Sequence, residues 1–179
     1  MIPSIENLVT DQMRACIGKT SPVMELPEEI SASDVRRYVE ATGDRNPLWM
    51  DDAYARAAGF RGRRVPPILI LQVYRRAPEW EMGDAMPWAG IELPPNFTNT
   101  RNAGHEVEWL EPVYVGDRLT IQYRLVDVYA RQGRSGPMLF LKRACEIRNQ
   151  DGRLVVRVTS TSAKLPAARF SGAGSAPAD

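Results

Sequence analysis

Apolar residues recur at helical spacing shortly before the first Gly-Asp pair of the chain. The stripe, at i, i+3, i+4 and i+7, consists of Val35, Tyr38, Val39 and Thr42. Ser31 and Asp34 have the spacing of a capping box, with Asp as a shorter partner than the usual Glu or Gln. Gly43 suits the left-handed position just past a helix end because it has no Cβ. The pattern predicts a helix with one buried face that ends at Gly43.

The longest apolar run, residues 68–73, follows two prolines. Proline is tolerated in the first turn of a helix, and the run is apolar nearly all round, so we predict a buried central helix. A strand is the competing assignment for so short a run. Before this run we expect a short strand at residues 23–26 and a short helix that is capped by Asp51 and ended by Gly59.

Residues 77–101 show no period, although they contain Trp80 and Trp88. So long a connection is either a functional loop or a surface insertion whose aromatic residues pack against its own underside. From His105 onward the pattern alternates in the manner of antiparallel strands, which are expected at residues 105–110, 119–125, 138–148 and 153–164. A phase slip near Val126 predicts a bulge, and Asp151-Gly152 predicts a tight turn.

One helix followed by a four-strand meander, with the earlier strand completing the sheet, is an α+β layout. We expect a single domain over residues 1–165, because 179 residues suit one sizeable core. The Ala, Gly, Ser and Pro content of residues 166–179 predicts a disordered tail.

Composition excludes several classes of function. With 23 basic and 22 acidic residues the formal charge is +1, which gives no field that favours nucleic acid. No apolar run is long enough to span a membrane, and the N-terminus lacks the form of a secretory signal, so a cytoplasmic location is expected. Cys16 and Cys145 lack metal-site spacing, and His105 is the one histidine of the chain, so no metal is expected.

The segment from Gly43 to Trp49 reads Gly-Asp-Arg-Asn-Pro-Leu-Trp. By turn chemistry alone, Asp44 and Asn46 are turn formers that bond to nearby backbone. The wider pattern, from Tyr38 to Ala55, resembles the signature of the MaoC-like (R)-specific enoyl thioester hydratases and dehydratases. That signature has a histidine where this chain has Trp49.

The resemblance implies the hot dog fold, a curled antiparallel sheet around a central helix. Residues 62–67 and 104–117 look like the N-terminal-type dehydratase domain, similar to a fungal fatty acid synthase dehydratase region, and the likeness covers about residues 18–165. Because hot dog domains pair, a homodimer or a heterodimer with a second hot dog subunit is implied.

The resemblance also assigns roles to residues. Asp44 is the carried-over catalytic carboxylate, Asn46 orients it, and His105 is a candidate substitute for the missing histidine, although a lone histidine at a strand edge is also an ordinary surface residue. The resemblance places a glycine at the start of the central helix, and the N–H of that glycine binds the thioester oxygen in active relatives. This chain has Pro67 there, and proline has no N–H. The residues expected to contact the acyl thioester are Trp49, Arg61, Arg63, Arg64, Val65, Pro67 and Trp88. The arginines suit the phosphates of coenzyme A or a phosphopantetheine arm, or form a solvated face.

Three functions remain open. The first is a half-site of a hydratase or dehydratase that binds the acyl tail and pairs with a catalytic subunit. The second is a self-sufficient homodimeric hydratase that uses Asp44 with His105 or another donor. The third is a module that binds acyl thioesters without turnover, with residues 80–97 as a lid. Thioester hydrolysis ranks lower, because the resemblance is to hydratases. No cofactor is expected, since the acyl thioester of coenzyme A or carrier protein is the substrate.

Overall fold

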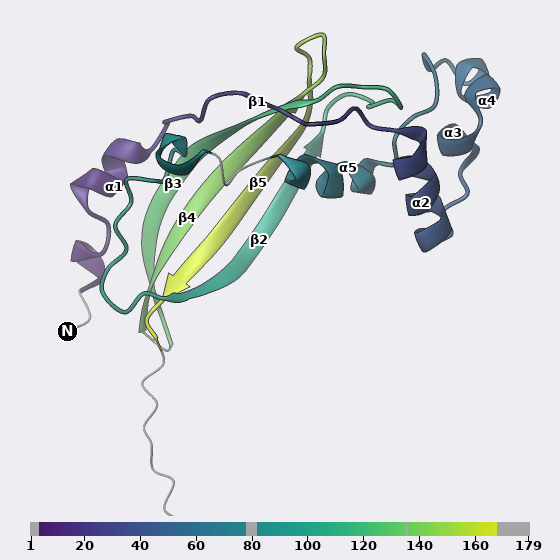
Figure 1. The fold of residues 1–179 in the computed structure, drawn as a ribbon. Coiled ribbons are helices and arrows are strands. Elements are labelled where there is room, and N and C mark those ends of the chain that lie inside the picture. The colour runs from purple at the N-terminus through teal and green to yellow at the C-terminus, as the bar shows by residue number, and fades with distance from the viewer. Residues whose placement is uncertain (1–3, 78–81, 135, 168–179) are drawn as a thin grey trace, which may run out of the picture.

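The computed structural model describes residues 4–77, 82–134 and 136–167. Its centre is a curled five-stranded antiparallel sheet with the strand order β1-β3-β4-β5-β2 (Figure 1). The strands are β1 (Met24–Glu25), β2 (Asn99–Trp109), β3 (Thr120–Gly133), β4 (Gly136–Arg148) and β5 (Leu154–Leu165). The α+β class and the hot dog layout that we expected are confirmed.

The helices stand at the two ends of this sheet. They are η1 (Ile5–Asn7), α1 (Asp11–Cys16), α2 (Ala32–Thr42), α3 (Pro47–Met50), α4 (Asp52–Ala57), α5 (Pro67–Val73), η2 (Tyr74–Arg76) and η4 (Gly83–Ala85). Figure 1 shows α1 beside one end of the sheet, α2, α3 and α4 beyond the other end, and α5 between that group and the sheet. The chain therefore presents the Gly-Asp corner, between α2 and α3, away from the middle of the sheet.

The local signals around α2 are confirmed. The Ser31 hydroxyl accepts a hydrogen bond from the Asp34 N–H at 3.1 Å, and the Asp34 carboxylate accepts one from the Ser31 N–H at 3.0 Å, which completes the capping box. Gly43 has φ 72°, the left-handed conformation that glycine adopts readily because it has no Cβ. The predicted stripe is one residue too long, because Thr42 is exposed and its hydroxyl donates to the Tyr38 carbonyl.

Helix α5 is correctly predicted, but its burial on all sides is not. Leu69, Ile70 and Val73 are buried against the sheet, whereas the side of the helix that carries Ile68 faces outward, with Ile68 53% exposed. No element in the described part of the chain covers this outward, apolar side of α5.

Strand β2 is the main correction to the predicted topology. The pattern placed a strand at residues 105–110 as the first of a meander, but β2 starts at Asn99 and pairs with β5 at the far edge of the sheet. Only β3, β4 and β5 form the meander, and β3 has β1 on its other side. Apart from Asn99 and Val107, which are half-buried, the residues of β2 are exposed. The predicted bulge is confirmed, since the β3–β4 register shifts between Leu125 and Asp127.

Among the described residues, two hydrophobic clusters form the core. The larger joins α5, Trp49 and the buried face of α2 to the sheet, and the smaller packs α1 and Phe97 on the other end of the sheet. Phe97, 2% exposed, comes from the stretch without sequence period. Trp80 and most of the predicted tail lie outside the described residues. Among the helices that the structure describes, none is long and apolar enough to cross a membrane.

Candidate functional site

The Asp44 side chain closes a turn between α2 and α3. One carboxylate oxygen accepts a hydrogen bond from the Trp49 indole Nε1–H at 3.0 Å, and the other accepts one from the Asn46 backbone N–H at 3.3 Å. The Asn46 side-chain oxygen accepts a bond from the Leu48 N–H at 3.0 Å and caps α3. Both polar side chains of the motif are therefore engaged in local turn bonds.

Trp49 thus stands at the position of the expected histidine, and its indole N–H donates to the Asp44 carboxylate. The indole is buried, with 7% exposure, and its nitrogen is a donor only. The pair Asp44–Trp49 can hold the corner in place, but the indole cannot accept a proton from water.

Arg64 lies against this corner. Its guanidinium carbon is 4.5 Å from the Phe60 ring centroid and 5.7 Å from that of Trp49, and its Nε is buried without a hydrogen-bond partner in the described structure. Arg64, Val65 and Pro67 line a small cavity of about 150 Å³ between α5 and the loop after β2. Pro67 is the first residue of α5 and has no N–H to offer there.

Of the other two arginines of this group, Arg61 has a bonded side chain, whereas Arg63 is bonded through its backbone. Arg61 pairs with the buried carboxylate of Asp117, and its guanidinium lies 4.0 Å from the Tyr114 ring centroid. The backbone N–H of Arg63 donates to Asp52 at 3.2 Å. A phosphate contact from these residues stays a prediction, and Arg61 is the least available for it.

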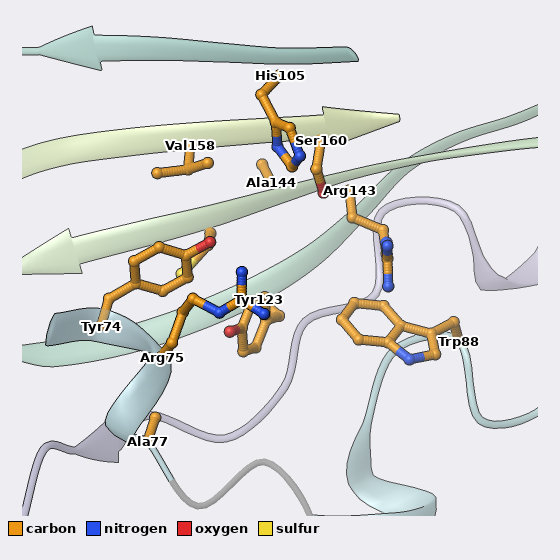
Figure 2. Close-up of a pocket in the computed structure, with 11 residues that line it drawn as sticks. Tyr74, Arg75, Ala77, Trp88, His105, Tyr123, Arg143, Ala144, Val158 and Ser160 are labelled. Atoms are coloured by element: carbon orange, nitrogen blue, oxygen red, sulfur yellow. The ribbon is translucent and has the colours of Figure 1, made fainter. Parts of the chain in front are cut away.

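His105 lies elsewhere. It lines a cavity of about 350 Å³ on the sheet, together with Trp88 and residues of η2, which directly follows α5 (Figure 2). Asp44 is not part of this cavity, and no hydrogen bond of the described residues joins Asp44 to His105. The structure therefore divides the predicted site residues into a corner set around Asp44 and a cavity set around His105 and Trp88.

The cavity contains residues that the sequence reasoning missed. They are Tyr74, Arg75, Ala77, Tyr123, Arg143, Ala144, Cys145, Val158 and Ser160. A signal for one of them was present, because Arg143 alternates in phase with Leu141 and Cys145 in a predicted strand. A charged residue at an inward-facing strand position is a candidate for ligand contact.

One ion pair fixes η2, the segment after α5 that leads into the cavity. Arg76 donates to the buried Asp34 carboxylate at 2.7 Å, across 42 residues. The bond from Arg76 holds the pKa of Asp34 well below its ordinary range, and the bond to Asp34 raises the pKa of Arg76. On the sheet, burial and then the charge of Arg143 lower the pKa of Lys164. In the described part of the chain, no group of three His, Cys, Asp or Glu side chains could hold a metal ion.

A curled antiparallel sheet with α5 against it and an Asp-bearing corner beyond defines a hot dog protein of the MaoC-like hydratase and dehydratase class. The ChsH1-ChsH2 complex from Mycobacterium tuberculosis has a similar chain, with TM-score 0.68 and 23% identity, over 92% of this chain and 93% of that one. The MaoC-like dehydratase from Rhodospirillum rubrum is similar with TM-score 0.58 and 18% identity, over 85% of this chain and 94% of that one. At these identities the likeness concerns the fold.

The family follows from the sequence comparison. Residues 15–158 match the family described as the FAS1-like dehydratase domain region, and the chain belongs to this family. The chain is also 24% identical over 153 residues to a probable enoyl-CoA hydratase alpha subunit of Thermomonospora curvata. That alignment covers 80% of this chain and 48% of the relative, so the chain spans about half the length of that protein.

Proposed function

We propose that this chain is the non-catalytic half-site of an enoyl thioester hydratase or 3-hydroxyacyl thioester dehydratase. It holds the acyl tail and pairs with a second hot dog subunit that supplies an intact Asp-His pair. The observation that carries this proposal is the 3.0 Å hydrogen bond from the Trp49 indole to Asp44, at the place where the family has its histidine.

The chemistry explains why this replacement matters. Hydration of a trans-2-enoyl thioester needs a base that takes a proton from water, an acid that delivers one to the α-carbon, and donors for the enolate-like oxygen. The indole of Trp49 cannot exchange protons with water, and Pro67 has no N–H for the oxygen. Asp44 alone would have to act as both base and acid, while its two oxygens accept bonds from the turn.

Pairing is supported by surfaces that the described part of the chain leaves open. Ile68 is 53% exposed on the outer side of α5, and β2 is an edge strand with mostly exposed side chains. An open edge strand and an exposed apolar helix face are features that a partner subunit covers. A similar solved chain belongs to a complex of two differently named proteins, and a curated relative is named an alpha subunit.

A self-sufficient hydratase is the second candidate, and the position of His105 favours it. This histidine faces a cavity large enough for part of an acyl chain. In that case substrate would bind across the cavity, and His105 would act as base or acid with Asp44 supplied by a second copy of the chain. A module that binds acyl thioesters without turnover is the third candidate.

The deciding experiment follows the enoyl absorbance of crotonyl-CoA and of a longer enoyl-CoA mixed with the purified chain alone. We expect no turnover, together with binding of the longer acyl-CoA detected by calorimetry. Hydration by the chain alone at an ordinary enzymatic rate would refute the half-site. In that event His105→Gln would separate the second candidate from a mechanism that uses Asp44 without histidine.

A further inference from the structure

The floor of the His105 cavity carries a polar row across three neighbouring strands. In the sheet register Arg143 of β4 lies opposite Ser160 of β5, and Ser160 lies opposite His105 of β2. Cross-strand partners project from the same face of a sheet, so the three side chains stand side by side. The next row is apolar and consists of Tyr123, Cys145, Val158 and Val107. Donors therefore lie directly beside an apolar surface.

Two guanidinium groups line this cavity, those of Arg75 and Arg143. None of the described residues that line it carries a carboxylate. Within the described residues no carboxylate lies at ion-pair distance from Arg143, and its buried Nε has no hydrogen-bond partner. A partly buried guanidinium with unused donors favours a bound anion.

The Arg143 guanidinium is also held in position. Its central carbon lies 4.9 Å from the Trp88 ring centroid, and Trp88 in turn meets Tyr123 edge to face at 5.5 Å. Figure 2 shows the Arg143 side chain extending from the sheet toward the Trp88 ring. Because stacking on an aromatic face orients the guanidinium fork, less rotamer entropy is lost when an anion binds to it.

We propose that this cavity is the acyl-tail pocket and that it selects acyl thioesters whose tail ends in a carboxylate. The carboxylate would accept hydrogen bonds from Arg143, with Ser160 beside it, while the methylene chain lies on the Trp88 and Tyr123 side. A planar carboxylate matches the two parallel donors of a guanidinium. The cavity volume of about 350 Å³ suits a short chain rather than the whole thioester. This inference rests on the proposed function, which supplies the acyl thioester as ligand.

The test compares two ligands of equal chain length by calorimetry with the full chain. Octanoyl-CoA ends in a methyl group, and the coenzyme A monothioester of octanedioic acid ends in a carboxylate. We expect the dicarboxylic ligand to bind about tenfold more tightly, a difference of about 1.4 kcal/mol. Arg143→Gln should abolish this preference, and Arg143→Lys should keep part of it. The matched control is Arg124→Gln, because Arg124 is exposed on β3 and, next to Tyr123, points to the other face.

Each outcome decides between specific alternatives. Equal affinities of the wild-type chain for the two ligands would overturn the carboxylate pocket, and this comparison needs no variant. A preference that survives in a folded Arg143→Gln chain would overturn the role of Arg143. Binding of free coenzyme A that is lost in Arg143→Gln would identify a phosphate as the anion and overturn the tail assignment. If octanoyl-CoA binds but the preference is absent, only this inference fails, whereas no binding of either ligand refutes the proposed function.

Discussion

The substitution Asp44→Asn distinguishes a structural role of Asp44 in the turn between α2 and α3 from a catalytic role. The carboxylate accepts hydrogen bonds from the Trp49 Nε1–H at 3.0 Å and from the Asn46 N–H at 3.3 Å. An asparagine has the same shape and one acceptor oxygen, so it keeps one bond and turns an NH₂ toward the other donor. A net hydrogen bond is worth roughly 0.5–1.5 kcal/mol, and Asp44 is exposed, so we expect a loss of about 1 kcal/mol of unfolding free energy.

The kinetic expectation is very different for the two roles. A general base contributes roughly 10²–10⁴ to the rate, which is about 3–5 kcal/mol of activation free energy. In a half-site the catalytic pair belongs to the partner, so the kcat of the assembled enzyme should change less than about threefold in Asp44→Asn. The two roles therefore differ by several kcal/mol, well beyond the effect of a loosened turn.

The assay measures enoyl-CoA absorbance with the reconstituted pair of subunits, and urea unfolding of the isolated chain checks stability. The matched control is Asp51→Asn, because Asp51 caps α4 by accepting the Tyr54 N–H at 3.0 Å and asparagine caps helices equally well. The control should leave both stability and kcat near the wild-type values. A hundredfold loss of kcat in a folded Asp44→Asn chain would refute the half-site.

Three further predictions concern stability and pairing. Asp34→Asn should lower the unfolding free energy by about 2–3 kcal/mol, less than a fully buried pair because Arg76 is 36% exposed. The folded pKa of Asp34 lies below its ordinary value of 3.8, so the carboxylate contributes its full stabilisation of the wild-type fold above pH 3.8. This stabilisation is lost as the pH falls through the folded pKa. The urea midpoints of wild type and variant should therefore converge in acid. Ile68→Asp should prevent subunit pairing in size-exclusion chromatography while the monomer stays folded. The control Val23→Asp, at an exposed residue directly before the edge strand β1, should leave pairing intact. Pairing by both variants would disprove the α5 interface. Leu139→Ala, at a fully buried position, should cost about 3 kcal/mol in urea, and a loss below 1 kcal/mol would contradict the packing of the smaller cluster.

Most of what the sequence predicted correctly depends on neighbours in the chain. The Ser31–Asp34 capping box, the left-handed Gly43, the Asp51 cap and the Asp151-Gly152 turn each involve residues within a few positions of one another. Such features follow from backbone sterics and short hydrogen bonds, which a local pattern contains. The family motif around Asp44 is equally local, so the sequence alone identified the class and the missing histidine.

The tertiary structure decided which distant residues meet. Sequence spacing alone could not place β2 beside β5 rather than β3, because this strand pairing joins residues that lie between 47 (Trp109 and Val156) and 66 (Asn99 and Leu165) positions apart, through backbone groups that every residue carries. The same pairing brought Arg143, Ser160 and His105 into one row and kept His105 apart from the Asp44 corner. The sequence determined that this chain has the family's corner with Trp49 in place of histidine, and only the fold determined that its histidine belongs to a different cavity.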